Sequence, residues 1–208
     1  AASDLYKRQV LHGCTHRVIG DRIVCATYLC AAAAAGGEVR LTGVDYRAVS
    51  TVALSLAESG CEVRSEADAV SLRSTGALRS VRPVRTAPYP GFPTDAQPVL
   101  MAALLRSEGC TVFVENIFEN RYRHVDELSR MGAEIRVAGR VAVVNGVTTL
   151  HGAAVKCTDL RGGAALVIAG LSAEGTTRVT ELTHIDRGYD AIERDLAALG
   201  AQIRRETT

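Results

Sequence analysis

The sequence predicts an α+β domain built from three repeated βαβαββ units, an inverse α/β-barrel-like arrangement with helices inside and sheets outside. Two recurring features lead to this prediction. The first is an acidic residue directly before an apolar helical segment, which occurs at Asp21, Asp95 and Asp159. The second is a glycine that ends an amphipathic helical segment and precedes a short strand, which occurs at Gly60, Gly132 and Gly200. One such unit cannot bury both of its faces, so we expect three units to pack around one axis.

The composition is that of a globular protein, and its charge is nearly balanced. Of its 208 residues, 47% are hydrophobic, which is enough for a sizeable core. The formal net charge of +1 gives no reason to expect nucleic acid or a membrane surface as partner. Any anion-binding site must therefore be local.

The cysteines and the apolar runs indicate a cytoplasmic protein. The six cysteines show no zinc-binding spacing and several lie in apolar runs, which favours reduced, mostly buried thiols and no metal site. The longest apolar stretch, residues 28–35, is too short to span a bilayer, and no signal peptide precedes it.

The first unit is expected at about residues 10–80. Residues 1–9 are polar and carry no continuing period, so we interpret them as a leader or an expression remnant. Asp21 is placed to cap a helix that leads to a strand at residues 37–41. This helix is apolar nearly all round, as a central helix should be. An amphipathic helix then leads through Gly60 to a second strand.

The second unit, at about residues 81–147, begins with a proline-rich loop. Its three prolines restrict the backbone of residues 86–97 and make the loop stiff. Asp95 stands where a helix N-cap belongs, directly before the apolar run 99–105. Two interpretations of Asp95 are open: it only caps the helix, or the rigid loop delivers its carboxylate to a functional site.

Two further connections contain residues typical of ligand-binding loops. Residues 115–122 mix aromatic, amide and charged groups. In the third unit, at about residues 148–208, an acid and a base precede two glycines within residues 158–163. The glycines would let a ligand approach the backbone, and Arg161 would bind a phosphate or carboxylate as a planar fork. The alternative is an aspartate cap with a solvated arginine.

The remaining polar candidates have simple structural alternatives. Arg187 would form only a surface ion pair with Asp186, which would contribute little. His124 and His184 are interpreted as polar residues flanking helices rather than as catalytic groups. If the units are related by rotation, their acidic helix starts lie at one end of the domain, where the positive helix ends can converge on an anion. No P-loop, dinucleotide-binding or nucleophile-elbow motif is present.

Four motifs together resemble one known family. They are residues 87–95, residues 115–121 with the following His124 and Val125, residues 158–161 and residues 184–189. From about Val10 to Arg205 the chain resembles the UDP-N-acetylglucosamine 1-carboxyvinyltransferases, the enolpyruvyl transferases of the first committed step of peptidoglycan synthesis. In that family two domains, each of three such units, close over the substrates. The sister enzymes that act on shikimate phosphate share the fold and match less well, because their proline-rich loop is not expected to have this sequence.

The resemblance implies transfer of the enolpyruvyl group of phosphoenolpyruvate to the 3-hydroxyl of UDP-N-acetylglucosamine, by addition and then elimination of phosphate, without a cofactor. It implies that Asp95 is the base at that hydroxyl and that Asp159 lies beside the reacting carbons. The other implied substrate-binding residues are Arg161 and Arg187 for phosphoenolpyruvate, Arg121 in the closed cleft, and Ile117 and Phe118 near the nucleotide sugar.

The sequence also departs from the family. The family's other domain supplies a lysine, arginines and a mobile loop with a reactive cysteine, and no stretch here resembles that loop. The resemblance therefore implies that residues 10–208 are a C-terminal domain whose partner is the missing N-terminal domain, and that the chain is inactive by itself. The alternative is a non-catalytic module of the same fold that binds a nucleotide sugar or a partner protein. The joint presence of Asp95, Arg161 and Arg187 argues against this alternative.

Overall fold

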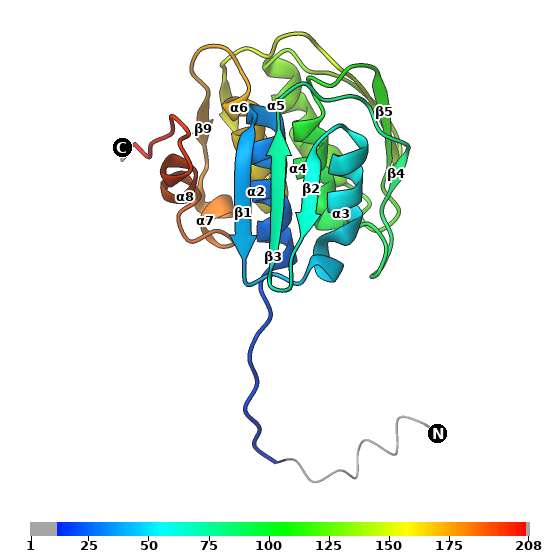
Figure 1. Cartoon of the computed structure of the whole chain (residues 1–208). Coiled ribbons are helices and arrows are strands. Elements are labelled where there is room, and N and C mark those ends of the chain that lie inside the picture. Colours follow the sequence, from blue (N-terminus) through cyan, green and yellow to red (C-terminus); the bar gives the residue numbers. More distant parts are fainter. Residues whose placement is uncertain (1–11, 207–208) are drawn as a thin grey trace.

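Three helices lie at the centre of the domain in the computed structural model, which describes residues 12–206 (Figure 1). They are α2 (Arg22–Ala35), α4 (Gln97–Ala103) and α6 (Leu160–Leu171), and each packs against the other two. Most of their residues are buried, including all seven of α4, as their apolar sequences require. The central helices therefore form the core. The predicted leader at residues 1–9 lies outside the described residues.

Three sheets lie around these helices. The first has the antiparallel order β1-β3-β2, with strands β1 (Gly37–Thr42), β2 (Glu62–Ser65) and β3 (Ala69–Ser74). The second has the order β4-β5-β7-β6, with strands β4 (Val84–Arg85), β5 (Cys110–Val114), β6 (Glu134–Ala138) and β7 (Val141–Asn145). Here β4 is parallel to β5, and the other pairs are antiparallel. The third sheet pairs β8 (Ala154–Lys156) with β9 (Arg178–Thr180) in parallel.

Further helices connect the strands. The α-helices are α3 (Tyr46–Glu58), α5 (Val125–Arg130), α7 (Thr183–Asp186) and α8 (Ile192–Ala198), and the 3-10 helices are η1 (Thr94–Ala96) and η2 (Arg121–His124). Gly60 and Gly132 follow α3 and α5 with φ angles of 111° and 91°. Glycine is suited to this left-handed conformation, which explains why it ends these amphipathic helices before a strand.

The predicted strand at residues 201–204 is wrong, since residues 201–206 form no strand. The corresponding strands β2 and β6 pair with β3 and β7, whereas residues 201–206 have no such partner among the described residues. Among residues 12–206, only the second unit contains a complete βαβαββ order. In the first unit residues 12–20 contain no strand before α2. The helix predicted through residue 105 ends at Ala103, although Leu104 and Leu105 remain buried.

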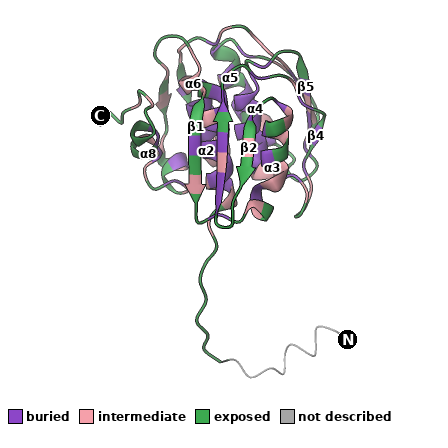
Figure 2. Cartoon of the chain, viewed as in Figure 1, coloured by how far each residue is buried: buried purple, intermediate pink, exposed green. Residues whose placement is uncertain are grey.

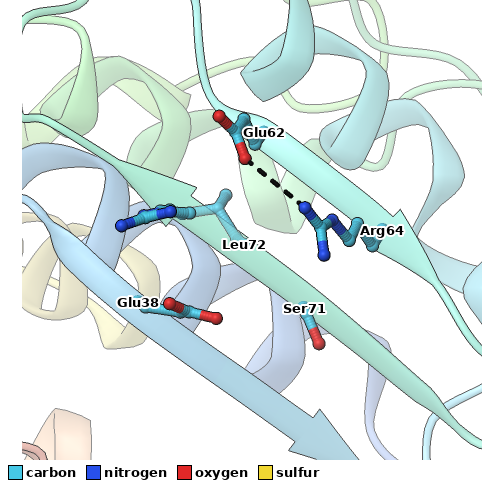
Figure 3. Close-up of a pocket in the computed structure, with 6 residues that line it drawn as sticks. Glu38, Glu62, Arg64, Ser71 and Leu72 are labelled. Atoms are coloured by element: carbon cyan, nitrogen blue, oxygen red, sulfur yellow. Dashed lines mark ion pairs between the residues drawn. The ribbon is translucent and has the colours of Figure 1, made fainter.

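The outer face of the first sheet is polar and exposed. Figure 2 shows buried residues on the central helices and on β3, and mainly exposed residues on β1 and β2 at either side of β3. A hollow of about 60 Å³ lies on this face, and Figure 3 shows the residues that line it: Glu38, Glu62, Arg64, Ser71, Leu72 and Arg73. Glu62 and Arg64 form an ion pair of 3.8 Å there. The hollow carries charges of both signs, as expected of a solvated sheet face.

The cysteines confirm the prediction of mostly buried thiols. All six are free; Cys14 and Cys110 are exposed, and the others are buried. Within residues 12–206, the helices lack the length and apolar character needed to cross a membrane.

Candidate functional site

Asp95 does not cap a helix. It lies in η1, inside a tight turn, and the N-terminus of α4 receives no side-chain hydrogen bond. The carboxylate of Asp95 instead accepts a hydrogen bond of 2.8 Å from Nη2 of Arg121 and one of 3.2 Å from Nη2 of Arg161. The cap-only interpretation of Asp95 is therefore wrong. A helical backbone at Asp95 prevents the extended conformation with which a capping residue reaches the first N–H groups of its helix.

Arg121 is buried, Arg161 is mostly buried and the carboxylate of Asp95 is partly open. The side chain of Arg121 is 8% exposed and that of Arg161 15%, while that of Asp95 is 40% exposed. The interpretation of Arg161 as a solvated arginine is therefore wrong. The group formed by one carboxylate and two guanidinium groups carries a net positive charge. This charge favours binding of an anion.

Glu115 holds the surrounding loops together. Its buried carboxylate accepts hydrogen bonds from the hydroxyls of Thr86 (2.9 Å) and Thr94 (3.0 Å) and from the backbone N–H groups of Ile117 (2.8 Å) and Phe118 (2.9 Å). These bonds join the start of the proline-rich loop, η1 and the connection after β5. The role of Glu115 was not recognised from sequence. The available signal was a lone acid directly after an apolar strand, which must find hydrogen-bond donors if it is buried.

The same network fixes Arg121. Its Nε donates to the hydroxyl of Thr94 at 3.1 Å, and its guanidinium lies 4.4 Å from the ring centroid of Phe118. The predicted sugar-contacting residues Ile117 and Phe118 are 44% and 54% exposed. Both side chains are therefore accessible to a ligand, and Phe118 lies against the arginine that pairs with Asp95.

Asp159 caps α6, as predicted. Its Oδ1 accepts hydrogen bonds from the backbone N–H groups of Arg161 (3.0 Å) and Gly162 (2.9 Å). The adjacent glycines serve packing and not the approach of a ligand, which corrects the expectation for this motif. A Cβ at Gly163 would lie 2.2 Å from Sγ of Cys157, so any side chain at this position would clash. Through Arg161, the start of α6 is connected directly to Asp95.

Arg187 lies near the same end of α6 but does not contact Asp95. It follows α7, which packs against α6, and a Cβ at Gly188 would lie 2.6 Å from Cδ1 of Leu160. Asp186 forms an ion pair of 2.6 Å with Arg205, so the predicted surface pair between Asp186 and Arg187 is wrong. The exposed Arg187 forms no ion pair within the described part of the chain.

The start of α2 lies at this end as well. Asp21 caps α2 through hydrogen bonds from Ile23 N (2.7 Å) and Val24 N (3.2 Å). The guanidinium of Arg22 lies 5.4 Å from the ring centroid of Tyr89 in the proline-rich loop, and α2 packs against η1. The three helix starts therefore lie at one end of the domain, as the repetition predicted. Arg22 and Tyr89 were not recognised from sequence, because only the fold brings them together.

His124 is buried and uncharged beside this site. Burial lowers its pKa from 6.5 to about 4, with Asp159 acting in the opposite direction. Neither of its ring nitrogens, nor the amide of the buried Gln97, has a hydrogen-bond partner among the described residues. His184 lies in α7 and is partly exposed. Within residues 12–206 no three His, Cys, Asp or Glu side chains are grouped as a metal site requires.

Known proteins resemble this chain in sequence over most of its length. The family model described as EPSP synthase (3-phosphoshikimate 1-carboxyvinyltransferase) matches residues 6–196. A curated UDP-N-acetylglucosamine 1-carboxyvinyltransferase from Gluconacetobacter diazotrophicus is 52% identical over 197 residues, which are 95% of this chain and 47% of that protein. Another from Desulfofundulus thermocisternus is 52% identical over 94% of this chain and 80% of its own length.

Solved structures share the fold. The enolpyruvyl transferase NikO from Streptomyces tendae has a TM-score of 0.80 and 31% identity over 90% of this chain and 44% of that one. The EPSP synthase from Acinetobacter baumannii has a TM-score of 0.71 at 22% identity, over 92% of this chain. The chain spans about half the length of the first of its curated relatives, at 47% and 46%. It belongs to the EPSP synthase family of enolpyruvyl transferases and, within that family, to the UDP-N-acetylglucosamine 1-carboxyvinyltransferases.

Proposed function

We propose that this chain is the C-terminal part of an enzyme that transfers the enolpyruvyl group of phosphoenolpyruvate to the 3-hydroxyl of UDP-N-acetylglucosamine. The observation that carries this proposal is the Asp95 carboxylate held between Arg121 and Arg161 at an otherwise open site. Family membership and the names of the curated relatives support the reaction class.

Asp95 would act as the base. During addition, the sugar oxygen bonds to C2 of phosphoenolpyruvate, the hydroxyl proton passes to the Asp95 carboxylate and C3 gains a proton. During elimination, the C–O bond to phosphate breaks and C3 loses a proton. The two ion pairs of Asp95 limit the rotation of its side chain, which favours proton transfer from a positioned hydroxyl. Asp159 would lie beside the reacting carbons.

Arg161 and Arg187 would hold phosphoenolpyruvate. Within residues 12–206, Arg161 donates only its Nη2 to a side chain, so its other N–H groups remain for an anion. Arg187 lies close to the same helix end and is exposed. Arg121 would line the closed cleft, and Ile117 and Phe118 would contact the nucleotide sugar.

The rest of the cleft would come from the missing N-terminal domain. We interpret this chain as three units, at about residues 10–80, 81–147 and 148–208, that form an inverse barrel with incomplete first and third units. The contacts among α2, α4 and α6 support this interpretation. The chain would then contribute the base and part of the anion site, and the isolated chain would not complete the reaction.

The test is a titration of the isolated chain with UDP-N-acetylglucosamine, followed by chemical shifts or heat. We expect weak binding that disappears in the Asp95→Ala variant. Glu108→Ala is the matched control, because Glu108 is an exposed acid that follows the other end of α4. Binding that survives in Asp95→Ala would contradict the assigned role of Asp95.

The same samples separate the alternatives. Phosphate release by the isolated chain with both substrates would contradict its expected inactivity. Tight binding of the nucleotide sugar that is independent of Asp95 and of phosphoenolpyruvate would favour a non-catalytic module. Absence of any binding would mean that domain closure creates the site.

A further inference from the structure

His124 carries two buried polar atoms that the protein does not pair. Its side chain is 0% exposed, and Nδ1 and Nε2 both lack a hydrogen-bond partner among the described residues. A neutral imidazole has one N–H donor and one acceptor nitrogen. Leaving such groups unpaired in a protein interior is costly, because they lose their hydrogen bonds to water, so a polar partner close to the ring is expected.

One acceptor close to His124 that is only partly used belongs to Asp159. The Oδ1 atom of Asp159 already caps α6, whereas Oδ2 contacts only the hydroxyl of Thr158, at 3.4 Å. A Cβ at Gly162 would lie 2.9 Å from Cβ of His124 and 3.0 Å from Oδ2 of Asp159. Both groups therefore border the same small space, and only glycine at position 162 leaves that space open.

The charges around the ring fit a neutral donor facing a carboxylate. The carboxylate of Asp159, from the start of α6, and the backbone of Arg121, on η2 itself, favour the charged imidazolium. Burial and the guanidinium charge of Arg121 oppose it, and burial, the largest effect, keeps the ring neutral. The ring therefore has one N–H to donate, and the free oxygen of Asp159 is an acceptor that bears charge.

We propose that His124 is a positioning residue that donates its single N–H to Oδ2 of Asp159 through one bridging water. A buried water of this kind joins polar groups that are too far apart for a direct bond. Arg121, at the other end of η2, pairs with Asp95. One 3-10 turn would then hold both acids, Asp95 through Arg121 and Asp159 through His124. The functional value of this contact rests on the proposed role of Asp159 in enolpyruvyl transfer.

The test is the tautomer of His124 in the full 208-residue chain, measured at pH 7 by long-range ¹⁵N–¹H correlation spectra. We expect one tautomer in about tenfold excess, because a hydrogen bond to a charged group contributes about 1.5 kcal/mol or more. Asp159→Ser should reduce the excess to about twofold or less. Serine retains an N-cap oxygen for α6 and removes only the oxygen that faces His124. Asp126→Ser, at an exposed acid two residues from His124, is the control and should leave the ratio unchanged.

A second measurement monitors the carboxylate of Asp159. The ¹³C signal of the Asp159 carboxylate should shift in His124→Phe and return towards the wild-type position in His124→Gln, which restores a donor. A purely structural role of His124 would not produce this rescue. An even tautomer mixture, or a ratio that Asp159→Ser does not change, would overturn the proposal even if UDP-N-acetylglucosamine binds. A confirmed hydrogen bond in a chain whose binding of UDP-N-acetylglucosamine survives in Asp95→Ala would instead contradict the proposed function of Asp95 alone.

Discussion

Two regions of this domain pair carboxylates with arginines in different surroundings. At the N-terminal ends of the central helices, the paired Arg121 and Arg161 are 8% and 15% exposed. On the outer face of the first sheet, Arg40 and Glu66 approach to 2.6 Å, yet they are 56% and 43% exposed. Water competes with an exposed ion pair and stabilises its separated partners, so distance alone does not measure its contribution. Burial distinguishes the site from the surface.

The two regions also differ in how many elements a carboxylate connects. Glu66 accepts hydrogen bonds from Arg40 and Ser71, all within one sheet. Glu115 accepts four hydrogen bonds and joins three segments that carry the candidate site. Loss of Glu115 would therefore release several groups at once, whereas water can replace Glu66.

The largest expected effect follows from replacing these two acids. We expect Glu115→Ala to lower the free energy of unfolding by about 3 kcal/mol, because buried donors lose their acceptor. Glu66→Ala should cause no measurable change. Urea denaturation of both variants at pH 7 measures the difference. Equal stabilities would show that the network around Glu115 does not hold the site.

A smaller effect is expected from the pH dependence of stability. An unfolded histidine takes up a proton below its pKa of 6.5, while folded His124 stays neutral down to about pH 4. The unfolded state therefore binds more protons in this range, and the free energy of unfolding falls as the pH drops. At pH 5 the contribution of His124 is about 2 kcal/mol unfavourable relative to pH 8. Urea midpoints should show this loss, and His124→Gln should remove it. If the pH dependence of the free energy of unfolding were unchanged in His124→Gln, folded His124 would take up a proton as readily as unfolded His124 does.

The smallest expected effect is the coupling within the ion pairs. A double-mutant cycle of Asp95→Asn and Arg121→Gln should give a coupling of about 1 kcal/mol, since one partner is buried and the other is partly open. The same cycle on Glu66 and Arg40 should give no measurable coupling. Raising the salt concentration should weaken the first coupling only in part, because Arg121 is shielded from ions while Asp95 is partly open to them. A coupling in the surface pair as large as that of Asp95 would contradict the role assigned to burial.

The spacing of apolar residues and the residues that begin and end helices predicted much of the fold. The apolar runs after Asp21 and Asp159 became the buried helices α2 and α6, and the glycines after α3 and α5 adopt the expected left-handed conformation. These features depend on neighbouring residues, so a single sequence contains them. Neighbouring residues alone could not show whether a strand follows Gly200, because a strand also requires a partner from elsewhere in the chain.

The candidate site was predicted in part. The motifs marked Asp95, Arg121 and Arg161, and the fold brings their side chains together within hydrogen-bond distance. The sequence did not reveal that Glu115 organises this group, nor that His124 is buried beside Asp159. Both facts depend on burial, which is set by elements distant in sequence.

By itself the sequence determined the repetition, the central helices, their aspartate-bearing starts and the resemblance to a family, because these are encoded by local residue order. The tertiary structure decided which alternatives are correct. Asp95 pairs with arginines from two other segments instead of capping α4, and the glycines of α6 make room for Cys157 and His124 instead of a ligand. Such choices follow from close packing between distant segments, where desolvation and available space decide which contacts form.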